Sequence, residues 1–226
     1  MSARGLFVTG TDTGVGKTLV ACALLHAFAQ RGSRVIGMKP VAAGAQLING
    51  IRINNDVEQL IAASNVSASR DLINPYCFEP PIAPHIAAGL QNKDIENETL
   101  CQSYECLSAL ADWVVVEGAG GFCVPLNDHE TSADLARQLA LPVVLVVGMR
   151  LGCLNHALLT AEAIRTRGLA LAGWVANHID PSMAHADANV AALHARLAAP
   201  LIARLGFSTT PDARALAPQF VLDAWS

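Results

Sequence analysis

The stretch GTDTGVGKT, residues 10–18, decides the fold of this chain. A short apolar run, Leu6-Phe7-Val8, comes before it, and an alanine-rich apolar pattern from Leu19 to Ala29 comes after it. In a strand, glycine-rich turn and helix of this kind, backbone N–H groups, the helix N-terminus and a lysine bind phosphates together. The stretch therefore predicts a phosphate-binding loop, the alternative being an ordinary glycine turn before a helix. The residues in that role are Gly14, Val15, Gly16, Lys17 and Thr18, with the Thr18 hydroxyl placed to ligate Mg²⁺.

The composition fits an α/β protein of moderate size. The chain has 226 residues, of which 52% are hydrophobic, enough for a sheet buried on both faces by helices. Its net charge is -4 and no run of lysine and arginine occurs, which argues against a general nucleic-acid surface. Met1-Ser2-Ala3-Arg4 leads directly into the first strand, and the longest apolar stretches are too short to cross a bilayer. We expect a cytoplasmic protein that binds neither nucleic acid nor membrane.

The six cysteines form no Cys-x-x-Cys pair. Together with a phosphate-binding loop, this favours a reduced, cytosolic chain over a disulfide framework. We expect most of the six to be buried, small apolar residues rather than ligands or nucleophiles.

Strand-like apolar runs alternate with helical patterns along the chain. The strands are expected at Leu6–Thr9, Val35–Met38, Trp113–Val116, Val143–Val147, Leu171–Ala176 and Leu201–Leu205. The helices are expected at Lys17–Gln30, Asp56–Ala63, Glu98–Ala111, Ser132–Leu139, Cys153–Arg167 and Ala184–Leu197. The alternation predicts an α/β fold, a doubly wound and mostly parallel sheet flanked by helices. With the phosphate-binding loop at residues 10–18, the fold is expected to be P-loop NTPase-like. Right-handed crossovers then place ligands at the carboxyl ends of the strands.

We interpret residues 1–226 as a single domain, with a core at about 5–207 and a short tail at 208–226. In the tail, Ala213–Trp225 is expected to form one short amphipathic helix. The proline-rich segment Asn74–Pro84 is expected to be a functional or edge loop rather than a linker.

Two charged residues are expected at the rim beside the phosphate-binding loop. Lys39 ends the second strand, which Pro40 stops. A second cation there would neutralise a transferring phosphoryl group or hold an anionic substrate. Asp56 opens the next helix. From these residues alone, a solvated lysine and a helix-capping aspartate are the alternatives.

Glu117 ends a buried hydrophobic strand and precedes the run Gly118-Ala119-Gly120-Gly121. A buried acid is costly unless it meets a cation, and glycines let the backbone approach a ligand closely. Mg²⁺ prefers a few carboxylates and hydroxyls together with phosphate and water oxygens. Thr18, Asp56 and Glu117 are therefore the candidate metal ligands, with a purely structural turn at Glu117 as the alternative.

Asn177 and His178 end the fifth strand. An asparagine amide offers both a donor and an acceptor, which matches the edge of a purine. Asparagine after a strand is also a common turn residue. From these residues alone, a nucleotide contact and a turn are both open.

One pattern covers nearly the whole chain, from Leu6 to about Leu205. Its first segment is Gly10–Thr18, where five rather than four residues separate Gly10 from Gly16. The other segments are Lys39-Pro40-Val41-Ala42, Arg52–Asp56, Asn74-Pro75-Tyr76, Pro84-His85, Trp113–Gly121, Leu141–Gly148, Leu151–Thr160 and Ala172–Asn177. Within it, Gly152-Cys153-Leu154-Asn155-His156-Ala157 is particularly specific, because a general nucleotide-binding loop gives no reason for it. Taken together, these segments resemble the dethiobiotin synthetase family.

The resemblance implies a carbon–nitrogen cyclo-ligase of biotin biosynthesis. That family joins CO₂ or bicarbonate to 7,8-diaminononanoate and closes a ureido ring, while ATP becomes ADP and phosphate. A substrate carbamate attacks the γ-phosphate to give a carbamic-phosphoric anhydride, and the neighbouring amine then displaces phosphate. Because carbamate and polyphosphate are both anionic, lysines and Mg²⁺ must screen a repulsion of several kcal/mol at about 4 Å in a partly buried site.

The resemblance also implies a role for each matching residue. Lys17 and the backbone of the loop would hold phosphates, Lys39 would steady the carbamate and the γ-phosphoryl group, and Thr13 would act near the reacting centre. Mg²⁺ would be held by Thr18, Asp56 and Glu117. The nucleotide would be lined by Glu117, Gly118, Ala119, Gly120, Asn177, His178, Gly206, Phe207 and Ser208. In a homodimer, the substrate would contact Ala43 of one subunit, and its carboxylate would reach Gly152, Cys153, Leu154 and Asn155 of the partner subunit.

Four places depart from the family's pattern. Gly14 stands where a glutamate is common, Ala43 where a serine often touches substrate, and His178 where an aspartate often follows the asparagine. Gly206-Phe207 replaces a Pro-Trp-like pair. These departures bear on affinity and nucleotide preference and leave the phosphate and metal residues intact.

Three alternatives share the same core. A partition-type ATPase would carry a signature lysine at the position of Asp12 and an aspartate near the end of the second strand, where this chain has Lys39. An amide-forming synthetase of the cobyrinate kind would need an ammonia-supplying glutaminase domain, whereas about twenty residues follow Gly206. A non-catalytic nucleotide-binding scaffold would not need Lys17, Thr18 and Glu117 together.

Overall fold

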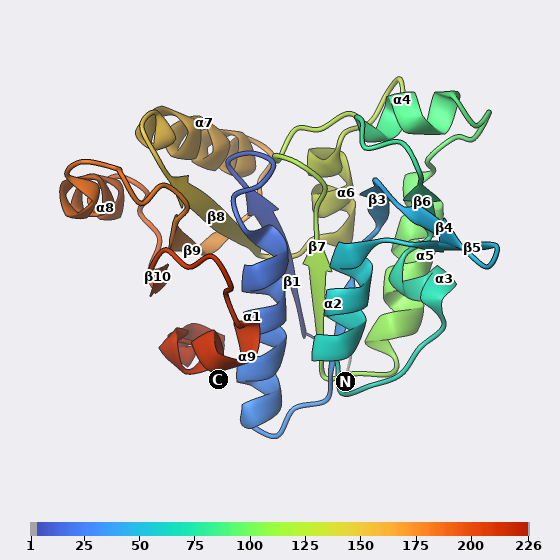
Figure 1. The fold of residues 1–226 in the computed structure, drawn as a ribbon, viewed down its shortest axis with the longest axis horizontal. Helices are drawn as coiled ribbons and strands as arrows, with labels where there is room; N and C mark the ends of the chain where they lie inside the picture. The colour runs from blue at the N-terminus through green and yellow to red at the C-terminus, as the bar shows by residue number, and fades with distance from the viewer. Residues whose placement is uncertain (1–3, 226) are drawn as a thin grey trace.

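A six-stranded parallel sheet forms the centre of the molecule, in the strand order β10-β9-β8-β1-β7-β2 (Figure 1). The structure is a computed structural model that describes residues 4–225. The strands are β1 (Arg4–Gly10), β2 (Val35–Met38), β7 (Trp113–Glu117), β8 (Val143–Met149), β9 (Leu171–His178) and β10 (Leu201–Leu205). Because β1 pairs in parallel with both β7 and β8, the loop that follows β1 leaves the sheet at its centre. The predicted fold class is confirmed.

Helices cover both faces of the sheet (Figure 1). They are α1 (Lys17–Gln30), α2 (Asn55–Ala63), α3 (Arg70–Ile73), α4 (Pro84–Gly89), α5 (Asn97–Ser108), α6 (Ser132–Leu139), α7 (Cys153–Thr166), α8 (Ala186–His194) and α9 (Ala213–Leu216). Successive strand residues point to opposite faces, so Leu6 and Val8 pack in the cluster that contains α1 while Phe7 packs in the cluster that contains α5 and α6. Strands buried on both sides explain why each reads as an uninterrupted apolar run.

Four short strands flank the rim of the sheet beyond β2. Strand β3 (Val41–Ala43) pairs in parallel with β6 (Tyr76–Phe78), and β4 (Gln46–Ile48) pairs with β5 (Ile51–Ile53) as a hairpin. The segment at residues 74–84, expected to be irregular, therefore contains β6 and reaches the first residue of α4. Strands of three residues show no alternation long enough to detect in a sequence.

Two sequence expectations are wrong. The tail forms no single helix over 213–225, because α9 ends at Leu216 and two 3₁₀ turns, Ala217–Gln219 and Asp223–Trp225, follow it. Pro218 lacks the N–H that a continuing helix needs. Beyond it, the backbone N–H of Val221 donates to the backbone oxygen of Ile202 on β10 at 2.8 Å.

The second concerns the cysteines, most of which are not buried. Only Cys22 and Cys153 are buried, and the partly or fully exposed ones are Cys77, Cys101, Cys106 and Cys123.

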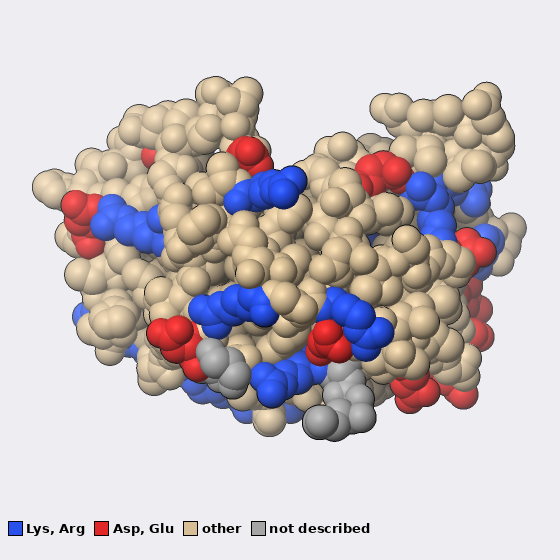
Figure 2. Space-filling view, turned by 90° about the horizontal axis from the view of Figure 1, so that it is seen from below, with Lys and Arg blue, Asp and Glu red and all other residues tan. Residues whose placement is uncertain are grey.

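Charges of both signs are mixed on the face at the amino ends of the strands, seen from below in Figure 2. Acidic and basic side chains lie beside one another there, as in the ion pair between Arg34 and Asp112 at 3.0 Å. This face therefore offers no broad surface of one sign. Among residues 4–225, none of the helices has the length and apolar character needed to cross a membrane.

Candidate active site

The phosphate-binding loop connects β1 to α1 and has the backbone that its glycines predict. Gly16 is the N-cap of α1 with φ +92°, and Gly14 has φ +74°, both in the left-handed region that favours glycine. A Cβ on Gly16 would lie 2.3 Å from Asn177 Nδ2, so a larger residue would be strained there and would displace the Asn177 amide. Lys17 is 7% exposed, and its Nζ donates to the backbone oxygen of Asp12 at 2.9 Å, which curls the loop back over the helix N-terminus.

Asn177, on strand β9, supports the phosphate-binding loop through a hydrogen bond. It lies near the end of β9 and is buried, and its Nδ2 donates to the backbone oxygen of Val15 at 2.8 Å. Val15 is itself fully buried, and its side chain lies where any side chain at Gly148 would have to go. The structure thus shows Asn177 and Val15 as supports of the loop; contact of Asn177 with a nucleotide stays a prediction.

A second cluster lies beside the loop, where the carboxyl ends of β2 and β7 meet. Lys39 Nζ donates to Glu117 Oε1 at 2.5 Å and lies 3.1 Å from Asp56 Oδ2. Thr18 Oγ1 donates to the same Glu117 oxygen at 2.9 Å. Residues from α1, β7, α2 and the end of β2 therefore converge on one point, as the sequence predicts from their positions at the carboxyl edge.

The structure decides between the readings that the sequence left open here. Lys39 is 4% exposed, so it is not a solvated lysine at a strand end. Asp56 does not cap α2, because the cap is Asn54, whose Oδ1 accepts from the backbone N–H of Asp56 and Val57. The Asp56 carboxylate instead faces the buried ammonium of Lys39.

The two lysines of the site differ in their electrostatics. Burial lowers the pKa of Lys17 to about 8, and the positive charge of Lys39 lowers it further against the pull of Glu117 and Asp56. Burial alone would lower the pKa of Lys39 as well, but the charges of Glu117 and Asp56 outweigh it and raise that pKa above its ordinary value. Lys39 therefore stays charged, while Lys17 titrates near physiological pH.

The residues around Glu117 fit a magnesium ion. Glu117 is 1% exposed, and its Oε2 has no hydrogen-bond partner among the described residues, which leaves a buried carboxylate oxygen uncompensated. The Asp56 carboxylate and the Thr18 hydroxyl lie around the same Lys39–Glu117 pair. Two carboxylates and a hydroxyl, completed by phosphate and water oxygens, form a donor set that Mg²⁺ accepts.

These groups open into a cavity of about 730 Å³. Of the predicted site residues, those that line it are Thr13, Gly14, Gly16, Lys17, Thr18, Lys39, Ala43, Asp56, Glu117, Ala119 and Gly120. Gly118 is not among the lining residues; its N–H donates to the backbone oxygen of Val8 at 3.0 Å, and a Cβ there would be 3.2 Å from the Phe7 ring. Pro81–Pro84 also line the cavity, and they belong to the segment 74–84 that was expected to be a functional or edge loop. Val41 and Val124 line it as well and had no predicted role in the site.

The residues expected around the purine lie in a separate hollow of about 600 Å³. His178, Gly206 and Phe207 line it, and Ser208 follows as an exposed residue. Arg204 on β10 faces this hollow and its Nε donates to His178 Nε2 at 3.3 Å. Burial and the nearby Arg204 charge lower the pKa of His178. Asn177, the residue before His178 on β9, bonds to the phosphate-binding loop, so the end of this strand contributes to both the loop's support and the hollow.

Gly152–Asn155 lie at the start of α7, outside the 730 Å³ cavity of their own chain. Cys153 is buried in the core, whereas Gly152 and Asn155 are exposed. Gly152 is the N-cap with φ +94° and provides no side-chain cap. Just before it, Arg150 pairs with Asp12 of the phosphate-binding loop. No sequence pattern indicates this pair, because the two residues are 138 positions apart.

Solved structures share this fold at low identity. The septum site-determining protein MinD from Pyrococcus horikoshii, solved with Mg-ADP, matches with a TM-score of 0.55 and 16% identity over 89% of this chain and 80% of that one. A ParA family ATPase from Chlorobium tepidum matches with a TM-score of 0.57 and 14% identity, over 99% of this chain and 92% of that one. At such identities the likeness shows the fold alone.

Sequence comparisons are far more specific. A family described as an AAA domain matches residues 4–212. The ATP-dependent dethiobiotin synthetase BioD of Nitrosospira multiformis is 59% identical over 94% of this chain and 92% of its own length. The protein of that name from Aromatoleum aromaticum is 57% identical over 88% of this chain and 88% of its own length. The one from a Janthinobacterium species is 53% identical over 87% of this chain and 85% of its own length. With identities this high over nearly the full length of both partners, the chain belongs to the ATP-dependent dethiobiotin synthetase family.

Proposed function

We propose that this chain catalyses the reaction of its family, the ATP-dependent closure of a ureido ring on 7,8-diaminononanoate with CO₂ or bicarbonate. Dethiobiotin, ADP and phosphate are the products. One observation carries the proposal: Lys17 and Lys39 lie in the same cavity as the buried Glu117 and the carboxylate of Asp56. A site for two anionic reactants needs cations held in place before the reactants arrive.

Lys39 is suited to bring the two anions together. An ammonium has three N–H donors, and the contacts to Glu117 and Asp56 use two of them, which leaves one for a carbamate or phosphoryl oxygen. Since both carboxylates raise its pKa, the group remains a cation throughout the reaction. Lys17 and the loop backbone hold the phosphates, and Thr13, which lines the cavity, lies next to the reacting groups.

Thr18, Asp56 and Glu117 are the residues that would hold Mg²⁺. When bound, Mg²⁺ neutralises charge on the polyphosphate. The carbamate oxygen then attacks the γ-phosphorus and releases ADP, and the second amine attacks the carbamate carbon, loses its proton and expels phosphate. The apolar wall at Pro81–Pro84 helps to exclude water from the mixed anhydride.

The remaining contacts involve the purine and a second subunit. His178, Gly206, Phe207 and Ser208 are proposed to surround the purine, in the hollow beside the loop. A homodimer would bring the start of α7 from the partner subunit to the cavity. Free N–H groups at a helix start bind carboxylates, and Gly152, with no side-chain cap, supports this role for the segment that ends at Asn155. Ala43 lines the cavity on the substrate side.

We also propose that one domain performs the whole reaction in the cytoplasm. All six cysteines are free, which suits a reducing compartment.

The test measures ADP release by the purified chain with and without bicarbonate and 7,8-diaminononanoate, and determines the mass of the product. We expect ADP release to require the diamine and a product with the mass of dethiobiotin. Release of ADP at the same rate without the diamine would indicate an ATPase and contradict the proposal.

A further inference from the structure

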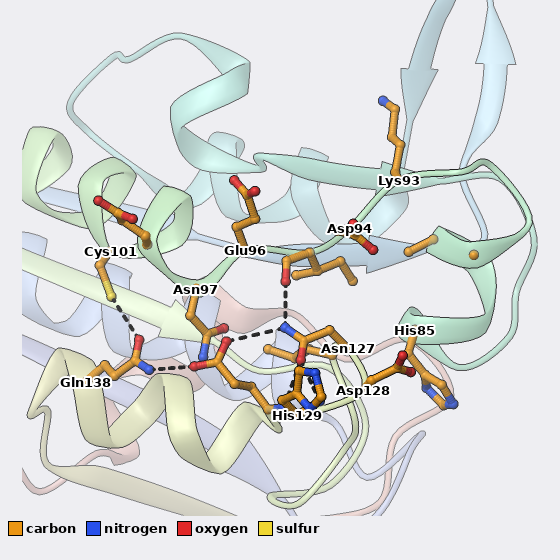
Figure 3. A pocket seen from close by; sticks show the side chains of 16 residues that line it. His85, Lys93, Asp94, Glu96, Asn97, Cys101, Asn127, Asp128, His129 and Gln138 are labelled. Atoms are coloured by element: carbon orange, nitrogen blue, oxygen red, sulfur yellow. Dashed lines mark hydrogen bonds between the residues drawn. The ribbon is translucent and has the colours of Figure 1, made fainter.

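A second cavity is larger than the one that holds the two lysines. It has a volume of about 1140 Å³ and lies between α4, the segment that leads into α5, and the loop at residues 126–130 (Figure 3). Helix α4 separates the two cavities, since Pro84 lines the smaller one and His85, the next residue, lines this one. The mechanism described above uses nothing in it.

An unpartnered amide lies in its wall. Asn97, the first residue of α5, is 3% exposed, and neither its Oδ1 nor its Nδ2 has a hydrogen-bond partner among the described residues. In Figure 3 its side chain lies between those of Asn127 and Gln138, which line the same cavity. His85 Nδ1 is likewise buried without a partner. Buried amides are almost always satisfied in folded proteins, so these atoms point to a ligand.

The lining is acidic. The carboxylates are those of Asp94, Glu96, Glu98, Asp128 and Glu130, and Lys93 is the one lysine that lines the cavity. Within residues 4–225, none of these five acids is in an ion pair with a lysine or arginine. Their summed field favours a cation in the cavity.

One of these acids is fixed in position. Glu130 Oε1 accepts from Gln138 Nε2 at 2.8 Å, and its Oε2 accepts from Asn127 Nδ2 at 3.3 Å. Asn127 is held in turn by its bond to the backbone oxygen of Ile95 at 2.8 Å. The carboxylate that lies on the same side as Asn97 is therefore preorganised, as a binding group needs to be.

The chemistry of the lining favours an organic cation over a metal ion. No three acidic, histidine or cysteine side chains in the described chain converge closely enough to hold a metal. A primary ammonium can donate to Asn97 Oδ1 and to a carboxylate at once, and the volume suits an extended ligand. We infer that this cavity is a second ligand site, which binds a small organic molecule carrying one or more primary ammonium groups through Asn97 and Glu130.

Calorimetric titration of the full chain with spermidine and with butane-1,4-diamine tests the inference. We expect saturable binding of at least one amine, and no binding of butane-1,4-diol, which has the same length and no charge. Asn97→Leu and Glu130→Gln should each weaken amine binding at least tenfold. Glu105→Gln, which removes an exposed charge from α5 outside the cavity, should leave it unchanged.

Each other outcome overturns the inference. The inference is wrong if no amine binds at millimolar concentration or if the diol binds as tightly as the diamine. It is also wrong if Glu105→Gln weakens amine binding as much as Asn97→Leu and Glu130→Gln do. Binding of Mg²⁺ or Ca²⁺ that Asn97→Leu abolishes, without amine binding, would indicate an inorganic cation site instead. If Asn97→Leu does not fold, Glu130→Gln decides alone, because Glu130 is a partly exposed side chain.

The source of the amine is decided by a further titration. The number of equivalents of 7,8-diaminononanoate bound is measured for the Asn97→Leu variant and for the unchanged chain, both in the presence of a saturating ATP analogue. A second equivalent of this diamine bound only by the unchanged chain would identify the substrate itself as the ligand. One equivalent in both proteins, with spermidine binding still dependent on Asn97, would identify a polyamine.

Discussion

At the scale of single residues, Lys39 is the most informative side chain of the site. It is buried against Glu117 and Asp56, so its removal leaves buried negative charge without a partner. We predict that Lys39→Met lowers kcat by roughly 10²–10³-fold and changes the Kd for ATP little, because phosphate binding depends mainly on Lys17. Turnover assays and ATP titration check this, and equal losses in both would show that Lys39 only holds nucleotide.

The same substitution has a predictable effect on stability. Breaking a buried ion pair by removing one partner costs about 3–5 kcal/mol, so Lys39→Met should have a clearly lower free energy of unfolding. The double variant Lys39→Met with Glu117→Gln should recover part of this loss while remaining inactive. Denaturant unfolding and turnover measured on the same samples separate the two effects, and a stable but inactive single variant would contradict the stability argument.

Lys17 provides a pH dependence with a definite sign. Its pKa is about 8 in the free chain because burial disfavours the charge. Bound polyphosphate favours the charge, so we predict that ATP binding takes up roughly half a proton or more at pH 8.5. Lys39, whose pKa is raised, contributes none. Calorimetry in buffers of different ionisation enthalpy measures the uptake, and a value near zero at that pH would contradict the assignment.

Thr18 tests the metal site without removing a charge. Its hydroxyl already donates to Glu117, the acid with an unpartnered buried oxygen. We expect Thr18→Val to weaken Mg²⁺-dependent ATP binding by about 10–100-fold and to leave binding without metal nearly unchanged. A magnesium titration measures this; identical curves for the two proteins would remove Thr18 from the ligand set.

At the scale of elements, the start of α7 is the part of the proposed site that a single chain leaves unused. Asn155 is exposed and lies outside the cavity of its own chain. We predict that Asn155→Ala raises the KM for the diamine about tenfold, the effect of one lost hydrogen bond to a charged group, with little change for ATP. Thr160→Ala, further along the same helix, is the control. A loss of ATP affinity instead would place the segment in the nucleotide site.

The central strands and the longer helices were predictable, and the short peripheral elements were not. Each strand of the central sheet and each helix of eight or more residues was predicted within about three residues at its ends. A strand buried on both faces is an unbroken apolar run, and a helix buried on one face repeats its apolar residues every three to four positions. Helices α3 and α4 and strands β3–β6 were missed, because these helices have fewer than two turns and these strands have three residues each. The predicted tail helix failed at Pro218, where loss of an N–H outweighs the apolar pattern.

At the scale of the whole molecule, the fold does not identify the activity. MinD and ParA family structures share it at 14–16% identity. Two local features speak against a partition-type role: Asp12 stands where those ATPases carry a signature lysine, and it pairs with Arg150. The hydrogen bond from the Thr13 backbone, followed by the Arg150 pairing, lowers the pKa of Asp12, so the ion pair persists at neutral pH.

The proposed dimer gives a prediction that no single chain can satisfy. Suppose that the cavity of one subunit uses α7 of its partner subunit. In a mixed dimer of one Lys39→Met chain and one Asn155→Ala chain, both substitutions then fall in the same site. The second site of that dimer is complete. At low diamine concentration, the mixture should reach about a quarter of the unmodified activity. Refolding the two variants together and assaying the mixture measures this. Activity equal to the average of the separate variants would mean that each site is built from one chain.

The central sheet, the phosphate-binding loop and the candidates Lys39, Asp56 and Glu117 could all be inferred from the amino-acid order, because apolar runs, glycines and charges at strand ends are local properties. The folded chain was needed to show that Lys39 is buried between two acids, that Asn54 rather than Asp56 caps α2, and that Asn177 supports the loop. It alone also revealed the Asp12–Arg150 pair and the acidic cavity around Asn97. These depend on contacts between residues far apart in the chain, and burial and pairing arise only when the strands lie side by side.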